Sequence, residues 1–451
     1  MPPSQGLSGL AFITSKETPD WVSCRVITAN LRSAYLIALG GKRPLEFVYS
    51  TDMSERALNL HGDEVLQLAK QIHAARPSRL VFLDHTPHPT ALVRALDRVY
   101  QDEKLPDFYF HIFGDFSLHA NYWMRLGSIF AKTHVVFICA SGRQAAFVSN
   151  LLKAGGPSTD ICPFPVNTEI FRPDKNLRRE WRLKLDLKED ETAFLYTGRM
   201  SLQKNFIHLF EQFGASLKRD SHPNKQLLLA GPFDDLGAPF FGLRENLGDC
   251  YRRYKAHRDA LPDEVRRRVH YLGNKSAEDL AGLYNAADYY INLSLQHDED
   301  FGMAPAEALC SGLPAILTSW GGFTGFTSTV ASDCRFVPVG FRLRKNGDVD
   351  KKKGLEINLS AVQKELAISK IDTSANAFEA RRMRGRRYNE RFSVAAMAAS
   401  LRAIHNKPLG HFAGFNGKMQ ALAFCMSEPI PFPEGMKPGT FYEMIYSTYF
   451  K

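Results

Sequence analysis

The chain has 451 residues, of which 44% are hydrophobic and 23% charged, a composition that is typical of folded globular proteins and excludes a disordered chain. Its length predicts two domains of roughly 200 residues each, because a single core rarely grows that large. The formal net charge of +9 favours anionic partners such as a phosphorylated ligand or a membrane surface.

The basic clusters, the cysteines and the N-terminus exclude several further classes. No aromatic residues alternate with the basic clusters, so nucleic acid is not an expected partner. The seven cysteines are scattered and form no Cys-x-x-Cys pair, which argues against a zinc site and fits a reducing, cytoplasmic compartment. There is no signal peptide pattern, and no apolar run approaches the ~18 residues of a membrane span. Attachment to the inner face of a membrane, without crossing it, remains an alternative.

Short β-rich runs alternate with helical periods in the first half of the chain. The expected strands are Leu10–Thr14, Leu45–Ser50, Arg79–Leu83, Phe108–His111, His134–Cys139 and Ile161–Phe164. The expected helices are Arg25–Leu39, Asp63–Ala75, Ala91–Tyr100, Tyr122–Ala131 and Arg143–Ala154. This alternation predicts an α/β domain with a mostly parallel sheet covered by helices on both faces.

The same alternation restarts in the second half. The expected strands are Thr192–Thr197, Gln226–Ala230, Val269–Leu272, Tyr289–Leu293 and Ala315–Thr318. The expected helices are Phe206–Leu217, Ala277–Ala286 and Met303–Cys310, followed by a long helical stretch from Ala377 to Ile404 with Ser393 as an internal N-cap.

These patterns predict two doubly wound α/β domains. We place the N-terminal domain at 1–172 and the second domain at 173–392, with a polar linker over 171–175. The stretch 393–451 is too apolar for a disordered tail, so we expect it to pack back on the protein, against the N-terminal domain. Ligands of open parallel sheets bind beyond the carboxyl ends of the strands, so two facing domains would share one cleft.

The stretch from Glu299 to Pro314 is the most informative part of the sequence. A helix is expected to begin near Met303, so the N–H groups of Phe301, Gly302, Met303 and Ala304 lie at its positive end and form a site for phosphate. Glu299 and Glu307 flank this site and would repel a phosphate unless they bind hydroxyl groups. A nucleoside diphosphate sugar has ribose on one side of the diphosphate and the sugar on the other, so it offers hydroxyl groups to both acids. The alternative is that both are surface acids near a helix start.

A second cluster follows the strand Thr192–Thr197. Gly198 ends the strand, and Arg199 and Lys204 lie in the loop before the next helix. Two cations beyond the carboxyl end of a strand can neutralise a diphosphate, the arginine as a fork and the lysine as a point charge. The alternative is an ordinary surface pair of cations.

Together these segments resemble the donor site of glycosyltransferase family 4, whose members are retaining glycosyltransferases of group 1 with the GT-B fold. The resemblance rests on the Glu-x7-Glu pair Glu299 and Glu307, on Gly198, Arg199 and Lys204, and on three further segments in the family's order. These are Pro165–Pro173, Val269–Gly273 with the helix after it, and Gly321-Gly322. The implied fold is two Rossmann-like doubly wound domains facing a central cleft.

The resemblance also implies roles for individual residues. Arg199 and Lys204 would bind the diphosphate, Glu307 the ribose and Glu299 the transferred sugar. The remaining donor contacts would come from Gly198, Gly273, Asn274, Phe301, Gly302 and Met303, with the base held at Gly273 and Asn274. Similar enzymes use neither a metal nor another cofactor, because the cations and the helix dipole stabilise the leaving group.

The N-terminal half carries weaker signals. The family often has a histidine after its fourth strand, and His111 is the candidate for that catalytic position; a core histidine is the alternative. His85 and His88 follow the third expected strand and are acceptor-side candidates, although a proline-rich turn explains the same residues. The glycine-rich turn of many relatives is absent after the first strand, where Lys16 and Arg25 are candidates to replace its contacts.

The function implied is transfer of a hexosyl group from a nucleoside diphosphate sugar to an acceptor hydroxyl, with retention, in the synthesis of cell-envelope polysaccharide or glycolipid. Two alternatives remain: a sugar-nucleotide epimerase or hydrolase of the same fold, and a non-catalytic subunit that binds nucleotide sugars. The intact set of Arg199, Lys204, Glu299 and Glu307 argues against the second.

Overall fold

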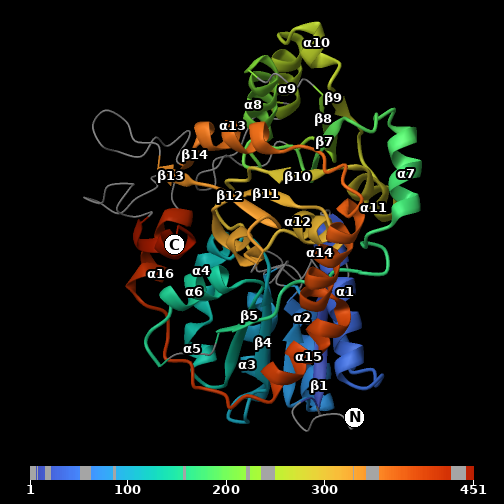
Figure 1. Ribbon diagram of the computed structural model, residues 1–451. Helices are drawn as coiled ribbons and strands as arrows, with labels where there is room; N and C mark the ends of the chain where they lie inside the picture. Colours follow the sequence, from blue (N-terminus) through green and yellow to red (C-terminus); the bar gives the residue numbers. More distant parts are fainter. Residues whose placement is uncertain are drawn as a thin grey trace. The chain divides into compact units, whose positions relative to one another are not determined.

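The computed structural model describes residues 7, 9–15, 22–50, 62–84, 88–155, 159–219, 224–234, 249–328, 330–341, 355–427 and 443–450. The chain forms two compact units (Figure 1). Unit 1 comprises Met1–Pro165, Val394–Tyr449 and Lys451, and unit 2 comprises Val166–Ser393 and Phe450. The divisions fall at 165/166 and 393/394, whereas the sequence suggested 172/173 and 392/393.

Unit 1 is built on a six-stranded parallel sheet in the order β2-β1-β3-β4-β5-β6. Its strands are β1 (Leu10–Ser15), β2 (Leu45–Tyr49), β3 (Arg79–Phe82), β4 (Asp107–Ile112), β5 (Val135–Cys139) and β6 (Thr159–Ile161). Every residue of the inner strands β4 and β5 is buried, and β1 and β3, which are also inner strands, have one partly exposed residue each, as expected for parallel strands covered on both faces. Much of the core is aromatic, with Phe110 stacked between Phe82 and Phe137.

Helices from both ends of the chain cover this sheet. They are α1 (Val22–Ala38), α2 (Gly62–Ala75), α3 (Thr90–Tyr100), α4 (Ala120–Arg125), α5 (Gly127–Phe130), α6 (Gly142–Asn150), α15 (Val394–His405) and α16 (Gly417–Ser427). The orange-red α15 packs along the blue α1, and α16 packs on α4 (Figure 1). Farther along, Tyr446 stacks on Phe147 of α6, so the C-terminal segment contributes to the core of unit 1.

Unit 2 is built on a second parallel sheet, in the order β12-β11-β10-β7-β8-β9. Its strands are β7 (Thr192–Thr197), β8 (Lys225–Ala230), β9 (Val269–Tyr271), β10 (Tyr289–Asn292), β11 (Ala315–Thr318) and β12 (Cys334–Val337), and β13 (Val339–Phe341) pairs with β14 (Leu355–Ile357). Its helices are α7 (Lys175–Lys184), α8 (Phe206–Arg219), α9 (Asp249–Asp259), α10 (Asp263–Arg266), α11 (Ala277–Ala286), α12 (Met303–Cys310), α13 (Leu359–Ile368) and α14 (Ala377–Phe392). The strand order reverses between β7 and β10, as in other doubly wound sheets.

The predicted α/β class with two doubly wound parallel sheets is confirmed, and β7, β11, α11 and α12 have the predicted bounds. Two local predictions are wrong. The sixth strand occupies Thr159–Ile161 rather than Ile161–Phe164, and the helix expected over Tyr122–Ala131 divides into α4 and α5 at Leu126. Among the described residues, no helix has both the length and the apolar character needed to cross a membrane.

Candidate functional site

The loops after β7 and β10 leave the sheet of unit 2 at the point where its strand order reverses. Ligands of open α/β sheets bind beyond the carboxyl ends of the strands at such a point. The loop 198–205 carries the two predicted cations, and the loop 293–302 carries Glu299 and leads into α12. The backbone N–H of Leu295 donates to the carbonyl of Gln203 at 2.9 Å, which ties the two loops together.

Lys204 and Glu299 form an ion pair at this point. Lys204 Nζ lies 2.9 Å from Glu299 Oε2, and the Ser294 hydroxyl donates to the same oxygen at 2.5 Å. Glu299 is only 3% exposed, so the two donors satisfy a carboxylate that would otherwise be costly to bury. The sequence therefore placed both residues at one site, but it gave no sign that they bind each other.

Arg199 is held beside the loop after β8. Its guanidinium pairs with Asp234 at 2.5 Å, and its carbonyl accepts a hydrogen bond from the Tyr196 hydroxyl at 2.6 Å. The neighbouring backbone is also fixed, because Met200 N donates to Pro232 O at 2.8 Å and Asp234 N donates to Met200 O at 3.0 Å. The arginine therefore starts from a defined position, half-buried at the edge of the site.

Glycine is required where these two loops meet. Gly231 has a φ of +139°, and a Cβ built on it would lie 2.0 Å from the carbonyl oxygen of Gly198. Gly231 N also donates to Gly273 O at 3.0 Å, which brings the loop after β9 to the same edge. Gly273 has a φ of +71°, and the adjacent Asn274 is exposed. The predicted base-side residues thus lie next to the Arg199 loop.

The N-terminus of α12 is open toward solvent. Gly302 precedes the helix with a φ of +95° and gives it no side-chain cap, and Met303 and Ala304 are partly exposed. The first N–H groups of a helix have no partner within it, so this end remains a site for an anion. The N–H of Phe301 donates instead to Asp300 Oδ1 at 2.7 Å.

Asp300 and Glu307 are acids with raised pKa values. Burial, reinforced by the nearby Glu299 carboxylate, raises the pKa of Asp300 to about 7. Burial also raises the pKa of Glu307 to about 7, against the effect of a hydrogen bond from Tyr284. That phenol lies 3.1 Å from Glu307 Oε2, and 2.7 Å from the hydroxyl of Thr197 at the end of β7. Sequence reasoning missed the contacts of Tyr284 and Thr197 because they depend on tertiary packing.

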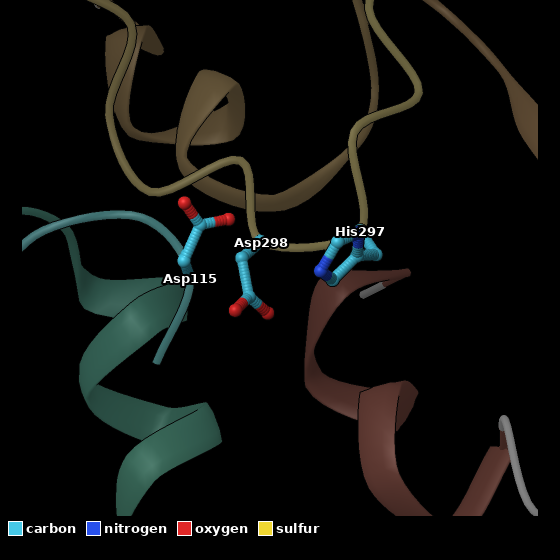
Figure 2. Close-up of side chains that lie close together, drawn as sticks. All are labelled: Asp115, His297 and Asp298. Carbon is cyan, nitrogen blue, oxygen red and sulfur yellow. The ribbon is translucent and has the colours of Figure 1, made fainter. Parts of the chain in front are cut away.

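Two more acid–base residues lie in the loop between β10 and α12. Figure 2 shows His297 and Asp298 projecting from this loop, and both are almost fully buried. Asp115, also labelled there, belongs to unit 1, where it follows β4 in a left-handed backbone conformation with φ +75°.

His111 does not have the position that the sequence predicted. It lies within β4, which continues to Ile112, and its side chain is fully buried. Its Nε2 lies 2.9 Å from the Tyr35 hydroxyl, which also lies 3.2 Å from Nε2 of His405. Burial lowers the pKa of His111 to about 3. The structure therefore places His111 within the strand rather than after it, which corrects the predicted position.

The acceptor-side candidates also belong to unit 1. Arg25 is exposed on α1. His88 is buried, with Nδ1 2.6 Å from Thr90 Oγ1 and its ring stacked on Tyr122. Lys16 and His85 lie outside the described residues.

Residues 178–328 match the family described as Glycosyl transferases group 1. This stretch begins in α7 and covers every donor-side residue named above. The matched stretch lies within unit 2.

Two curated proteins are similar over part of their length. One is an uncharacterised glycosyltransferase of Methanocaldococcus jannaschii, 29% identical over 143 residues, which are 32% of this chain and 31% of that protein. The other is the lipopolysaccharide 1,2-N-acetylglucosaminetransferase of Salmonella typhimurium, 28% identical over 181 residues, which are 40% of this chain and 43% of that protein. The similar stretches thus span less than half of either relative.

The fold as a whole is shared with solved structures. The Anabaena protein HepE, solved in complex with UDP and glucose, superimposes with a TM-score of 0.60 at 12% identity, covering 89% of this chain and 100% of that chain. The predicted GT-B fold is thereby confirmed.

Proposed function

We propose that this protein transfers a hexosyl group from a nucleoside diphosphate sugar to an acceptor hydroxyl, with retention of configuration at the anomeric carbon. One observation carries the proposal: two cations, Arg199 and Lys204, lie at the strand-order reversal of unit 2 together with the open start of α12 and the acids Glu299 and Glu307. The match of residues 178–328 to group 1 glycosyl transferases supports it.

In this proposal the positive groups bind the diphosphate. Arg199 offers a planar fork and Lys204 a point charge, and the first N–H groups of α12 add a positive helix end. Both side chains are already paired with carboxylates, so they are oriented before the donor arrives. Preorganised donors of this kind stabilise the charge that develops on a departing diphosphate.

The two acids act on hydroxyl groups in this scheme. Glu299 binds the transferred sugar and Glu307 the ribose, so neither carboxylate has to face the phosphates. The acceptor hydroxyl attacks the anomeric carbon from the same face as the one from which the leaving group departs. The departing phosphate takes the proton of that hydroxyl. Catalysis is then mainly positioning and electrostatics, and we propose that no metal is needed. We therefore expect dialysis against EDTA to leave the turnover of the enzyme unchanged.

The comparisons suggest which substrates to try first. HepE was solved with UDP and glucose, and one partial relative is a lipopolysaccharide 1,2-N-acetylglucosaminetransferase. We therefore propose a UDP-hexose or UDP-N-acetylhexosamine donor and an acceptor in cell-envelope polysaccharide or glycolipid synthesis. We also propose a cytoplasmic location, and the net charge of +9 supports binding to the anionic inner surface of a membrane.

A thermal-shift screen with UDP-, GDP- and ADP-sugars tests the donor site. A ligand that binds only the folded protein raises its melting temperature, by an amount that grows with concentration. The shift should disappear in Arg199→Ala and Lys204→Ala and persist in Arg386→Ala, which removes an exposed arginine on α14. NMR of the product should then show a retained anomeric configuration. Epimerised or free sugar formed without an acceptor would instead identify an epimerase or hydrolase.

A further inference from the structure

Tyr284 occupies the centre of a buried polar network beneath the donor site. Its side chain is fully buried, although it comes from α11 rather than from either loop of the site. The hydroxyl lies 2.7 Å from Thr197 Oγ1 and 3.1 Å from Glu307 Oε2. It therefore joins the residue that directly precedes Gly198 and Arg199 to the acid on α12.

The direction of these hydrogen bonds follows from the groups present. A carboxylate can only accept, so Tyr284 donates its single proton to Glu307. The Thr197 hydroxyl then donates to the phenol oxygen, and the carbonyl of Thr197 accepts a hydrogen bond from Tyr290 of β10 at 3.2 Å. In such a chain each bond polarises the next, which strengthens the bond that Glu307 receives.

The backbone around Tyr284 is unusually well fixed. Arg178 donates to the carbonyls at the end of α11, those of Asn285, Ala286 and Ala287, and the buried Arg381 donates to Tyr284 O and Ala287 O. Two residues earlier there is no room for a side chain, because a Cβ on Gly282 would lie 2.1 Å from the Trp181 ring. The phenol thus has a rigid base from which to hold the carboxylate.

Glu307 requires such support to act as an ionised acceptor. Among the described residues, the titratable groups that interact with Glu307 include Tyr284, Tyr290 and Cys310, which are neutral and supply no positive charge. Burial raises the pKa of Glu307 to about 7, and the Tyr284 hydrogen bond is the effect that opposes the rise. Without the phenol the acid would be protonated over a wider pH range and free to rotate.

We propose that Tyr284 is a positioning residue: it fixes one oxygen of Glu307 and thereby aims the carboxylate at the ribose hydroxyls of the donor. This inference rests on the proposed function, and it adds a determinant of ribose recognition that the donor itself does not touch. The effect of removing the phenol should therefore depend on whether the ligand has ribose hydroxyls.

The test uses Tyr284→Phe in the full chain, with whichever of UDP, GDP and ADP binds the wild type most tightly and its 2′,3′-dideoxy counterpart. Calorimetry should show the ribonucleotide bound roughly tenfold more weakly by the variant, the equivalent of one hydrogen bond to a charged group. The dideoxy nucleotide should bind both proteins equally. The midpoint of the pH dependence of ribonucleotide affinity should move upward in the variant, because Glu307 would keep its proton longer.

Tyr388→Phe is the matched control, since this buried tyrosine donates to Phe326 O elsewhere in unit 2, and it should leave both affinities unchanged. If Tyr284→Phe does not fold, Thr197→Val removes the other hydroxyl of the network and should show a smaller loss, about threefold, again confined to the ribonucleotide. Equal weakening of both nucleotides, or none, would overturn the inference. A wild type that binds no nucleoside diphosphate would overturn the proposed function instead.

Discussion

Lys204 Nζ and Glu299 Oε2 lie 2.9 Å apart, and this ion pair joins the loops that follow β7 and β10. The Glu299 carboxylate is almost completely buried, so Lys204 has a role in the folded protein even when no phosphate is bound. It neutralises an acid that, in the proposed function, binds hydroxyl groups of the donor sugar. A donor bound here would share Lys204 with Glu299, and its sugar hydroxyls would approach a carboxylate that is already oriented.

Lys204→Ala should therefore lower both turnover and stability, and the two effects can be measured separately. Turnover should fall about 10²- to 10³-fold because a preorganised positive charge is lost, and Arg199→Ala should lose a similar factor. The free energy of unfolding should also fall by about 3 kcal/mol, since Glu299 is left buried without its cation. Steady-state kinetics and urea denaturation measure the two effects.

The double variant Lys204→Ala/Glu299→Gln separates these effects. It should recover most of the lost stability, because the buried charge is gone, but none of the turnover. Lys364→Ala, at an exposed position on α13, should change neither quantity. Recovery of turnover together with stability would show that Lys204 acts only as a structural partner.

Asp300 should make donor affinity depend on pH. Its carboxylate accepts the N–H of Phe301 at the start of α12, and its pKa is raised to about 7. Above that pH the ionised group adds negative charge where the diphosphate is proposed to bind. Between pH 6 and 8 the affinity of the wild type for a nucleoside diphosphate should fall by about fivefold relative to Asp300→Asn, the equivalent of ~1 kcal/mol. Calorimetry at three pH values measures this difference, and parallel curves for the two proteins would contradict it.

Glu307 should make stability fall as pH rises. Its folded-state pKa is about 7 against an ordinary value of 4.5, so the folded protein holds this proton more tightly than the unfolded chain. The resulting stabilisation is fully present below pH 4.5 and is lost as pH rises through 7. Over that range the wild type should lose about 3 kcal/mol relative to Glu307→Gln. Chemical denaturation from pH 4.5 to 8 measures the difference, with Glu264→Gln at an exposed position of α10 as a control that should follow the wild type.

Gly231→Ala should disrupt the edge of the site without removing any polar group. The new methyl carbon would lie 2.0 Å from Gly198 O, and the φ of +139° disfavours any side chain. We expect a loss of about 3 kcal/mol in unfolding free energy and weaker binding of the donor, because the Arg199 loop must move. Gly340→Ala on β13, where a Cβ meets nothing within 4 Å, should be neutral in melting temperature and affinity. Unchanged donor binding by Gly231→Ala would show that the loop contact is not needed.

The sequence predicted the elements of unit 2 that carry the donor-side residues because their local signals agree with the fold. α12 begins after a glycine and ends before Gly312 as its start and stop signals require, and β7 has four apolar or aromatic residues in a row between two threonines.

Other elements of unit 2 carry no such signal. α9 has only two buried residues, Cys250 and Tyr254, among many charged ones, so no apolar period marks it as a helix. α7 is similarly charged, and its first turn depends on the Asp174 side chain, which accepts from the N–H groups of Asn176 and Leu177.

Residue types and spacing were enough to predict that Lys204 and Glu299 lie at one site. They did not predict that the two side chains form an ion pair or that Glu299 is buried. The partnership of Asp234 with Arg199 joins residues 35 positions apart, and that of Tyr284 with Glu307 joins two helices. His111 shows the opposite case. A histidine near a strand end suggested chemistry, whereas the chain places it in a fully buried strand against Tyr35.

Unit 1 is assembled from both ends of the polypeptide, whereas nearly all of unit 2 is one continuous stretch. The buried side chains of Leu401 and Ile404 in α15, a helix packed against α1, leave the ribosome only after residues 166–393. During synthesis, residues 166–393 can therefore complete their fold first, while the earlier-made strands of unit 1 still lack a covering helix. A premature stop codon near position 394 would spare most of unit 2 and leave unit 1 with exposed apolar surface.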